Sequence, residues 1–264
     1  MHDAIESAKK VIIENMNIAK EQTGVLNPYG DMSLLLDIKA EDAIIGVLSS
    51  SSTDFEILTE EKGYIKCDNK PEYLALIDPI DGSANLTRGI PLVSIGISVV
   101  PYTSSMTSDD AELSIIDSVF TDETYVAVTG RGVTRNGVTV RPSTSVNLRE
   151  AIISFDTKRT WDTEFLKCSL RTVGAVHDTR RTASNLLDLC WTASGFLDAM
   201  VDLRNMLPII HLCGTHMVFE AGGFVLDQRG NRFHSSLESD KMMSFVAASN
   251  EMLAQQILAK FNGS

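Results

Sequence analysis

Two aspartates stand three positions apart after an apolar run in the segment LALIDPIDGSANLTRGIP, residues 74–91. We interpret LALID as a buried strand that ends at Asp78, because Pro79 has a fixed φ and no N–H for a sheet. A turn would then bring Asp81 back toward Asp78. Two close carboxylates repel each other unless a cation lies between them or one is protonated. Together with the Ile80 carbonyl they offer only oxygen ligands, which suit Mg²⁺ or Mn²⁺.

The residues that follow predict an anion site next to these carboxylates. Gly82 and Ser83 stand where a helix is expected to begin, and the free N–H groups and dipole of a helix start can bind phosphate. A metal site beside an anion site indicates phosphate chemistry. The alternative for DPIDG alone is a surface turn in which the aspartates cap local N–H groups.

Further carboxylates precede this segment in two other motifs. ILTEEKG supplies Glu60 and Glu61 after an apolar run, and LLLDIKAED supplies Asp37. Any one of these residues, taken alone, is more often a solvated surface charge than a ligand. Their order along the chain, rather than any single residue, makes them candidates.

Taken together, these motifs resemble those of the inositol monophosphatase family of metal-dependent sugar phosphatases, and most of all its archaeal enzymes acting on inositol monophosphate and fructose bisphosphate. The resemblance extends almost from end to end. Thr59 replaces the usual Gly of the Gly-Glu-Glu segment, and Ser83 replaces the usual Thr of the first signature. The other matching segments are the hairpin TGRGVTRNG, the helix region RTASNLLDLCWTASGFLDAMVD and the segment EAGGFVLD.

The resemblance implies a role for each matching residue. Glu60, Asp78 and the Ile80 carbonyl would hold one Mg²⁺, whose bound water is the nucleophile. Asp78 and Asp81 would share a second Mg²⁺ that stabilises the leaving oxygen.

Two further groups complete the implied site. Asp37 and Ser83 would orient and deprotonate the attacking water. The backbone N–H groups of Gly82 and Ser83 would bind the phosphate.

The second signature departs from the family. Members carry an aspartate, a ligand of the second metal, at the start of the helix that leads into Glu-Ala-Gly-Gly. Counting back from Glu220 places Ile210 there, and a one-residue deletion places His211 there instead. A histidine can bind a divalent ion but suits Mn²⁺ or Zn²⁺ better than Mg²⁺. The alternative is that His211 only starts the helix and bonds to the backbone.

One basic residue is a candidate for substrate binding. Arg204, in the segment DLRN, matches the region where related enzymes hold basic residues near the non-reacting end of the substrate. Pairing with Asp202 on the surface is the alternative.

The pattern of apolar residues predicts two halves. Residues 1–140 combine helices over 1–22 and 38–50 with strand-like runs, which indicates an α+β domain carrying the metal and phosphate motifs. Residues 141–264 alternate strand and helix, which indicates an α/β domain that completes the site. The resemblance implies that the two form a layered α-β-α-β-α sandwich.

Composition limits the partners and the compartment. The net charge of −12 argues against nucleic acid. The longest apolar run, IPLVSIGISVV, is shorter than the roughly 20 residues of a membrane helix, and no signal peptide is evident. Four scattered cysteines without a CxxC pair indicate no disulfide framework or zinc ribbon. We therefore expect a cytoplasmic protein without membrane or nucleic-acid partners, and the resemblance implies a homodimer.

These observations lead to two functional hypotheses. The first is a Mg²⁺-dependent phosphomonoesterase, with Mn²⁺ as an alternative ion, that hydrolyses a small polyol or sugar phosphate such as inositol 1-phosphate or fructose 1,6-bisphosphate. Water would attack in line, without a phosphoenzyme. The second is a catalytically impaired relative that binds phosphorylated ligands or a partner subunit.

Overall fold

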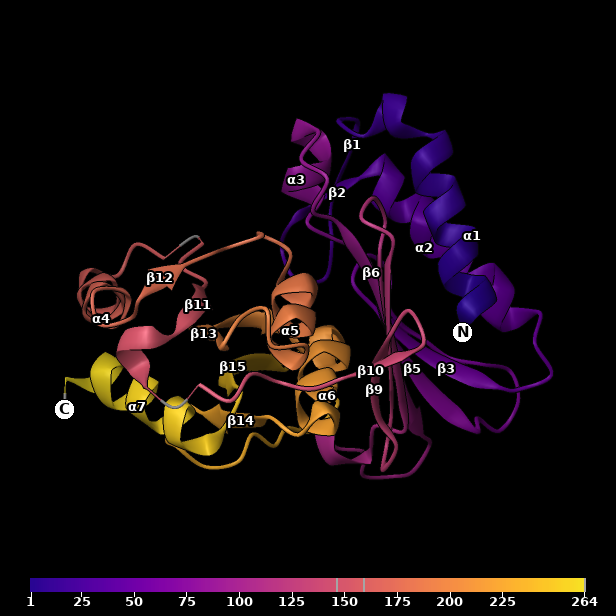
Figure 1. The fold of residues 1–264 in the computed structure, drawn as a ribbon. Helices are drawn as coiled ribbons and strands as arrows, with labels where there is room; N and C mark the ends of the chain where they lie inside the picture. The colour runs from indigo at the N-terminus through magenta and orange to yellow at the C-terminus, as the bar shows by residue number, and fades with distance from the viewer. Residues whose placement is uncertain (146, 159, 264) are drawn as a thin grey trace.

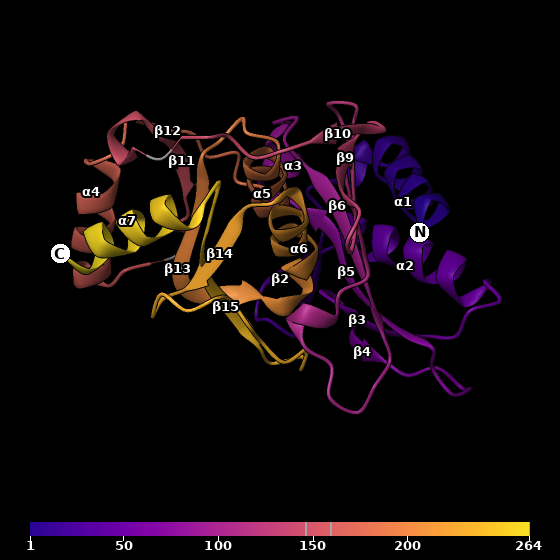
Figure 2. The same ribbon diagram turned by 60° about the horizontal axis from the view of Figure 1, so that its bottom comes forward.

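The computed structural model describes residues 1–145, 147–158 and 160–263, which form five alternating layers of helices and sheets (Figure 1). Helices α1 (His2–Glu14) and α2 (Leu35–Ser49) cover the outer face of a large sheet. Helices α5 (Asn185–Ala193) and α6 (Leu212–Ala221) fill the space between this sheet and a smaller one. Figure 2 shows α4 (Thr163–Val173) and α7 (Glu251–Asn262) on the far side of the smaller sheet. The predicted α-β-α-β-α sandwich is confirmed.

The large sheet has eight strands in the order β10-β9-β8-β7-β6-β5-β3-β4. All neighbours are antiparallel except β3 and β5, which are parallel. The strands are β3 (Phe55–Thr59), β4 (Gly63–Ile65), β5 (Tyr73–Asp81), β6 (Ser94–Pro101), β7 (Leu113–Ser118), β8 (Glu123–Val128), β9 (Gly132–Arg135) and β10 (Val138–Val140). The predicted hairpin in TGRGVTRNG is present, and the polar segment 101–112 is a connection between two strands of this sheet.

The smaller sheet has five strands in the order β12-β11-β13-β15-β14. Strand β11 runs parallel to both of its neighbours, and the remaining pairs are antiparallel. The strands are β11 (Ile152–Phe155), β12 (Asp178–Thr179), β13 (Ala199–Pro208), β14 (Phe224–Asp227) and β15 (Met242–Ala248). The change of sheet falls between Val140 and Ile152, near the predicted boundary at residue 140, and the division into two domains stays a prediction.

Short elements complete the chain and lie around the candidate site. Strands β1 (Gln22–Leu26) and β2 (Met32–Leu34) form a separate hairpin, and α3 (Ser83–Arg88) follows β5. Four 3₁₀ turns are described, namely η1 (Met16–Ile18), η2 (Ser108–Asp110), η3 (Leu148–Glu150) and η4 (Ile209–His211). Among the described residues, no helix combines the length and apolar character needed to cross a bilayer.

Three apolar clusters hold the layers together. One joins α1 and α2 to the large sheet, and another joins α7 to the outer face of the smaller sheet. The third lies between the sheets and contains the apolar faces of α5 and α6. Gly96 on β6 allows close packing here, since a Cβ on it would lie 2.4 Å from Leu186 and 2.7 Å from Cys213. The central helices therefore begin close to the part of β5 and β6 that carries the aspartates.

Candidate metal and phosphate site

A β-bulge in β5 places both aspartates on one side of the sheet. Asp78 pairs with Gly96 and Asp81 pairs with Ser94, so three steps along β5 correspond to two along β6. Residues three apart in a regular strand face opposite sides, and one extra residue restores the same side. The prediction that the strand ends at Asp78 is wrong: the chain remains in the sheet through Asp81 despite Pro79. The convergence of the two carboxylates comes from this bulge and not from a turn.

The carboxylate of Asp81 lies at the start of α5. Its Oδ2 accepts hydrogen bonds from Ser184 Oγ (2.6 Å), the Leu186 backbone N–H (2.6 Å) and Ser94 Oγ (3.3 Å). The helix dipole favours a negative charge here. Because these contacts all involve Oδ2, they fix the side chain and leave Oδ1 for a ligand.

Asp78 is fully buried, and only one of its two carboxylate oxygens accepts a hydrogen bond from the described residues. Its Oδ1 accepts a hydrogen bond from the Ile80 N–H at 3.2 Å. Its Oδ2 accepts no well-aligned hydrogen bond from the described residues and lies 3.1 Å from Nε2 of His211. One ligand atom each from Asp78, Asp81 and His211 lie within 4.8 Å of one another. This is the geometry of a site for a divalent cation.

His211, and not Ile210, faces the carboxylates. Ile210 is fully buried in the apolar cluster between the sheets. His211 ends η4 and precedes α6, and its Nδ1 lies 3.2 Å from the Pro208 carbonyl. When Nδ1–H donates to this carbonyl, the neutral ring presents its Nε2 lone pair to the site. The predicted backbone bond is therefore present, and the same bond orients Nε2 toward Asp78.

The charges of the aspartates act strongly on this histidine. Burial alone would lower the pKa of His211, but the negative charges of Asp78 and Asp81 raise it. The ring therefore competes with a cation for the same carboxylates.

Asp37 and Ser83 lie together at the starts of two helices. Asp37 is in the first turn of α2, and Ser83 Oγ lies 3.4 and 3.3 Å from its two carboxylate oxygens. The same hydroxyl lies 3.0 Å from the Ile80 carbonyl, to which it can donate instead. Burial, followed by the charges of Glu61 and Asp78, raises the pKa of Asp37 well above its usual value. The pair can pass a proton between the hydroxyl and the carboxylate.

Glu60 brings a further carboxylate from the turn after β3. Burial raises its pKa well above the usual value, and the nearby charges of Asp78, Glu61, Asp37 and Asp81 act in the same direction. Raised pKa values at Asp37, Glu60 and Asp81 indicate a site that favours positive charge.

The turn that carries Glu60 is held by a buried carboxylate of α2. Glu41 Oε1 accepts from Thr59 Oγ1 at 2.6 Å and from the N–H groups of Glu61 and Lys62 at 3.0 and 3.2 Å. Thr59, where the family has Gly, thus uses its hydroxyl to fix the turn. Glu61 itself accepts a hydrogen bond from Ser33 Oγ.

The donor set fits divalent cations. Glu60, Asp78 and the Ile80 carbonyl offer oxygen atoms, and the buried Asp78 Oδ2, which accepts no well-aligned hydrogen bond from the described residues, is the observation that calls for a positive ligand. Asp78, Asp81 and His211 offer a mixed oxygen and nitrogen set. Mixed sets suit Mn²⁺ better than Mg²⁺.

Gly82 forms the predicted start of α3. It adopts the left-handed conformation with φ 99°, and a Cβ there would lie 2.9 Å from the Leu92 carbonyl oxygen. The first N–H groups of a helix lack partners within it. The N–H groups of Gly82 and Ser83 directly follow Asp81 in the chain. They therefore lie at the place where the sequence predicts a phosphate site.

Arg204 is committed to protein carboxylates. It lies on β13, where it bonds Asp202 through Nε at 2.9 Å, Asp156 at 2.8 Å and the Lys158 carbonyl at 2.9 Å. Its side chain is only 5% exposed, so the pairing with Asp202 is present but buried rather than on the surface. Substrate binding by Arg204 stays a prediction.

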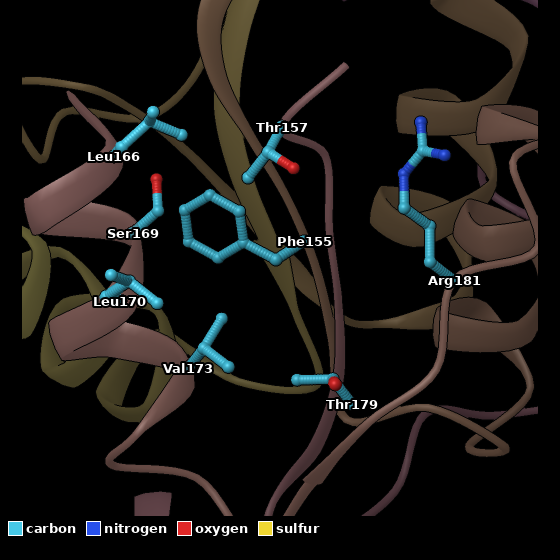
Figure 3. Close-up of a pocket in the computed structure, with 8 residues that line it drawn as sticks. All are labelled: Phe155, Thr157, Leu166, Ser169, Leu170, Val173, Thr179 and Arg181. Atoms are coloured by element: carbon cyan, nitrogen blue, oxygen red, sulfur yellow. The ribbon is translucent and has the colours of Figure 1, made fainter. Parts of the chain in front are cut away.

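A separate pocket of about 280 Å³ lies beside α4 and holds none of these residues. Figure 3 shows it lined mainly by apolar side chains, including Phe155, Leu166, Leu170 and Val173, with Arg181 at one side. It presents no carboxylate. It is therefore not a metal site.

Ser184, which donates a hydrogen bond to Asp81 from the start of α5, is a site residue that was not predicted from the sequence. Its side chain also accepts from the Leu187 N–H, as a helix N-cap does. Ser184 lies immediately before the apolar run NLLDLC within the predicted helix region RTASNLLDLCWTASGFLDAMVD, and a serine there is a helix-start signal that could have indicated it. Ser33 donates a hydrogen bond to Glu61, and Ser94 donates one to Asp81. No comparable sequence signal indicates these two roles.

Comparison with known proteins gives consistent matches. The family model described as "Inositol monophosphatase family" matches residues 2–264. A "Fructose-1,6-bisphosphatase/inositol-1-monophosphatase" of Thermococcus kodakarensis is 30% identical over 241 residues, which cover 91% of this chain and 86% of that protein. A "Nus factor SuhB" of Pasteurella multocida is 27% identical and covers 91% and 89%.

A solved structure agrees in fold over nearly the whole chain. The crystal structure of the extragenic suppressor protein suhB of Bartonella henselae superposes with a TM-score of 0.84 at 24% identity. The match covers 99% of this chain and 96% of that one. At this identity the match establishes the fold.

Proposed function

Because the chain belongs to the inositol monophosphatase family, we propose that it is a divalent-metal-dependent phosphomonoesterase that hydrolyses a small polyol or sugar phosphate. Inositol 1-phosphate and fructose 1,6-bisphosphate are the substrates that the names of its relatives suggest. The observation that carries the proposal is the convergence of Asp78, Asp81 and His211 within 4.8 Å. The Asp37–Ser83 pair beside them supports it.

Two sets of residues would hold the metal ions. Glu60, Asp78 and the Ile80 carbonyl would hold one ion, and Asp78, Asp81 and His211 a second. When bound, such ions supply an activated water and neutralise the charge that develops on the leaving oxygen.

The side chains of this chain position the reactants and move one proton. The N–H groups of Gly82 and Ser83 hold the phosphate against the carboxylates. A water proton passes to Ser83 Oγ as the hydroxyl proton passes to Asp37, whose carboxylate oxygens lie 3.3 and 3.4 Å from that hydroxyl. The water oxygen bonds to phosphorus and the bond to the ester oxygen breaks. The ester oxygen leaves on the opposite side as an alkoxide, which takes a proton from solvent water, and Asp37 returns its proton to solvent. No residue is phosphorylated in this scheme.

The test is a phosphate-release screen with inositol, fructose, glycerol and nucleotide monoesters, each with Mg²⁺ and with Mn²⁺. We expect turnover of a polyol or sugar phosphate, lost on chelation and in Asp81→Asn. Turnover that persists in EDTA would contradict the proposal.

A second candidate is a catalytically impaired relative that binds phosphorylated ligands or a partner subunit. Two observations favour it: His211 stands where the family has a metal-binding aspartate, and the chain is 27% identical to a Nus factor SuhB. No phosphate release with any ester or metal, together with phosphate binding by calorimetry, would support this candidate.

We further propose a homodimer in the cytoplasm, with neither membrane nor nucleic-acid partners. The net charge of −12 supports the last point. Light scattering after size exclusion tests the dimer, which a mass of 28.9 kDa for the particle would contradict.

A further inference from the structure

The tip of the β1–β2 hairpin carries a tyrosine whose hydroxyl has no partner. Tyr29 Oη is buried and accepts or donates no hydrogen bond within the described part of the chain. A buried polar atom without a partner costs on the order of 1–3 kcal/mol. The ring of Tyr29 packs against the apolar cluster between the sheets. Because a phenylalanine would pack in the same way, the hydroxyl calls for a separate explanation.

The surroundings of this hydroxyl identify it as a donor. A tyrosine hydroxyl is protonated at neutral pH, because its ordinary pKa is about 10. The turn that carries Glu60 is held against this hairpin tip, and the charges of Glu60 and Asp78 both act on the hydroxyl. With metal ions on those carboxylates, the oxygen atoms still open to an O–H donor are those of a bound ligand.

The hairpin tip is preorganised. Asn27, which is 6% exposed, accepts through Oδ1 from the N–H groups of Tyr29 (3.1 Å) and Asp31 (2.9 Å). The backbone N–H of Asn27 donates a further hydrogen bond to the Asp31 carbonyl at 2.8 Å. These bonds close the turn around Tyr29, so its ring does not need to be ordered when a ligand binds.

The tip is also fixed to the turn that carries the glutamates. Asn27 Nδ2 lies 3.5 Å from Glu61 Oε1. Pro28 packs closely on Gly63, because a Cβ added to Gly63 would lie 3.2 Å from the Cγ of Pro28. Tyr29 and Glu60 therefore belong to two loops that are held as one unit.

We infer that Tyr29 is a substrate-contacting residue whose hydroxyl donates a hydrogen bond to an oxygen of the phosphate group bound beside Glu60 and Asp78. The inference rests on the proposed function, because it requires a phosphate at this place. A hydrogen bond from a neutral hydroxyl to an anionic oxygen is short and strong. It adds to the N–H groups of Gly82 and Ser83 a phosphate contact from a second segment of the chain.

The test is calorimetric binding of inorganic phosphate, in the presence of Mg²⁺ or Mn²⁺, to the wild type, to Tyr29→Phe and to the control Tyr64→Phe. Tyr64 lies on β4 and is 41% exposed. We expect about tenfold weaker phosphate binding by Tyr29→Phe, as befits a lost hydrogen bond to a charged group. Metal binding without phosphate and the melting temperature should match the wild type, and Tyr64→Phe should bind like the wild type.

Three results would overturn the inference in distinguishable ways. Equal phosphate affinity in Tyr29→Phe and wild type would remove Tyr29 from the site while leaving the proposed function intact. Weaker metal binding by Tyr29→Phe without phosphate would show that the hydroxyl acts on the carboxylates and not on the ligand. No metal-dependent phosphate binding by the wild type would overturn the proposed function, and the role of Tyr29 with it.

Discussion

Nε2 of His211 lies 3.1 Å from Oδ2 of Asp78, so an imidazole occupies the place beside the metal carboxylates where the family carries an aspartate. The neighbour Ile210 faces the opposite way, into the apolar cluster. Of the two candidates at this position, His211 is therefore the one that faces the carboxylates, although counting along the sequence places Ile210 there.

We expect His211→Asp to bind Mg²⁺ at least about tenfold more tightly than the wild type, because it restores an all-oxygen set. The wild type should prefer Mn²⁺, and the variant should lose this preference. Calorimetric titration with both ions measures the change.

Ile210→Asp is the matched control. It would bury a carboxylate among apolar side chains, which costs several kcal/mol or forces protonation. We expect a lower melting temperature and no gain in Mg²⁺ affinity. A well-folded Ile210→Asp that binds Mg²⁺ more tightly would show that the segment is positioned differently from this structure.

We expect Asp81→Asn to raise the melting temperature of the metal-free protein while it lowers phosphate release. Burial and the charge of Asp78 raise the pKa of Asp81. A group with a raised pKa contributes stability below its unfolded pKa and loses it as the pH rises through the folded pKa. At pH 8 in EDTA the asparagine variant should therefore melt at a higher temperature than the wild type, and this advantage should vanish near pH 4.

Metal ions should reverse that order. Mg²⁺ or Mn²⁺ stabilises the wild type by binding only its folded state, whereas the variant has lost a ligand and should gain less. Phosphate release by the variant should fall by at least about 10²-fold, the scale of removing one electrostatic contact in a reaction site. Equal melting of both proteins in EDTA at every pH would contradict the electrostatic argument.

The sequence motif identified neighbouring candidate residues but not the backbone that brings their side chains together. Asp78, Asp81 and Ser83 belong to a dense local motif, and their types alone indicate chemistry. The β-bulge was not predicted, because Pro79 normally ends a ladder and the register with β6 depends on a strand thirteen residues away. Spacing along one segment cannot reveal which residue of the partner strand it opposes.

The remaining gaps have the same cause. The choice between Ile210 and His211 depends on the turn η4, which the count from Glu220 treats as regular helix. Tyr29 lies in a loop without a motif, and its relation to Glu60 exists only after the hairpin folds against the β3–β4 turn. Such contacts between distant segments carry no local signal.

His216 should make the protein less stable in mild acid. This residue of α6 lies 2.8 Å from Ser114 Oγ and 3.0 Å from Thr129 Oγ1, and burial lowers its pKa to about 4. The unfolded chain binds a proton near pH 6.5, so stability falls as the pH drops from 6.5 to 4. The full loss is about 3 kcal/mol at 1.36 kcal/mol per pKa unit.

His216→Gln isolates this contribution from the carboxylates, which titrate with the opposite sign. The difference in unfolding free energy between wild type and variant should be constant above pH 7 and should shift against the wild type between pH 6.5 and 4. Denaturant unfolding at five or six pH values measures it. A difference that stays constant across this range would mean that His216 is protonated without cost in the folded state.

The two glycines that flank α3 provide a paired test of the phosphate site. Both adopt left-handed backbone, with φ +99° at Gly82 and +71° at Gly89. A Cβ on Gly82 would also meet the Leu92 carbonyl at 2.9 Å, whereas one on Gly89 meets nothing within 4 Å. We expect Gly89→Ala to cost about 1 kcal/mol from backbone strain alone. Gly82→Ala should cost a further ~1–3 kcal/mol, because the segment at Leu92, which precedes β6, and the start of α3 must move apart.

Activity should distinguish these variants more strongly than stability does. Moving the start of α3 displaces the N–H groups of Gly82 and Ser83 from the phosphate, and a displacement of 1 Å can cost about 10²-fold in rate. Phosphate release by Gly82→Ala should fall on that scale with weaker phosphate binding, while Gly89→Ala should remain close to the wild type. If both variants lost activity equally, the effect would come from the helix as a whole, and the amides at its start would not be the phosphate contacts.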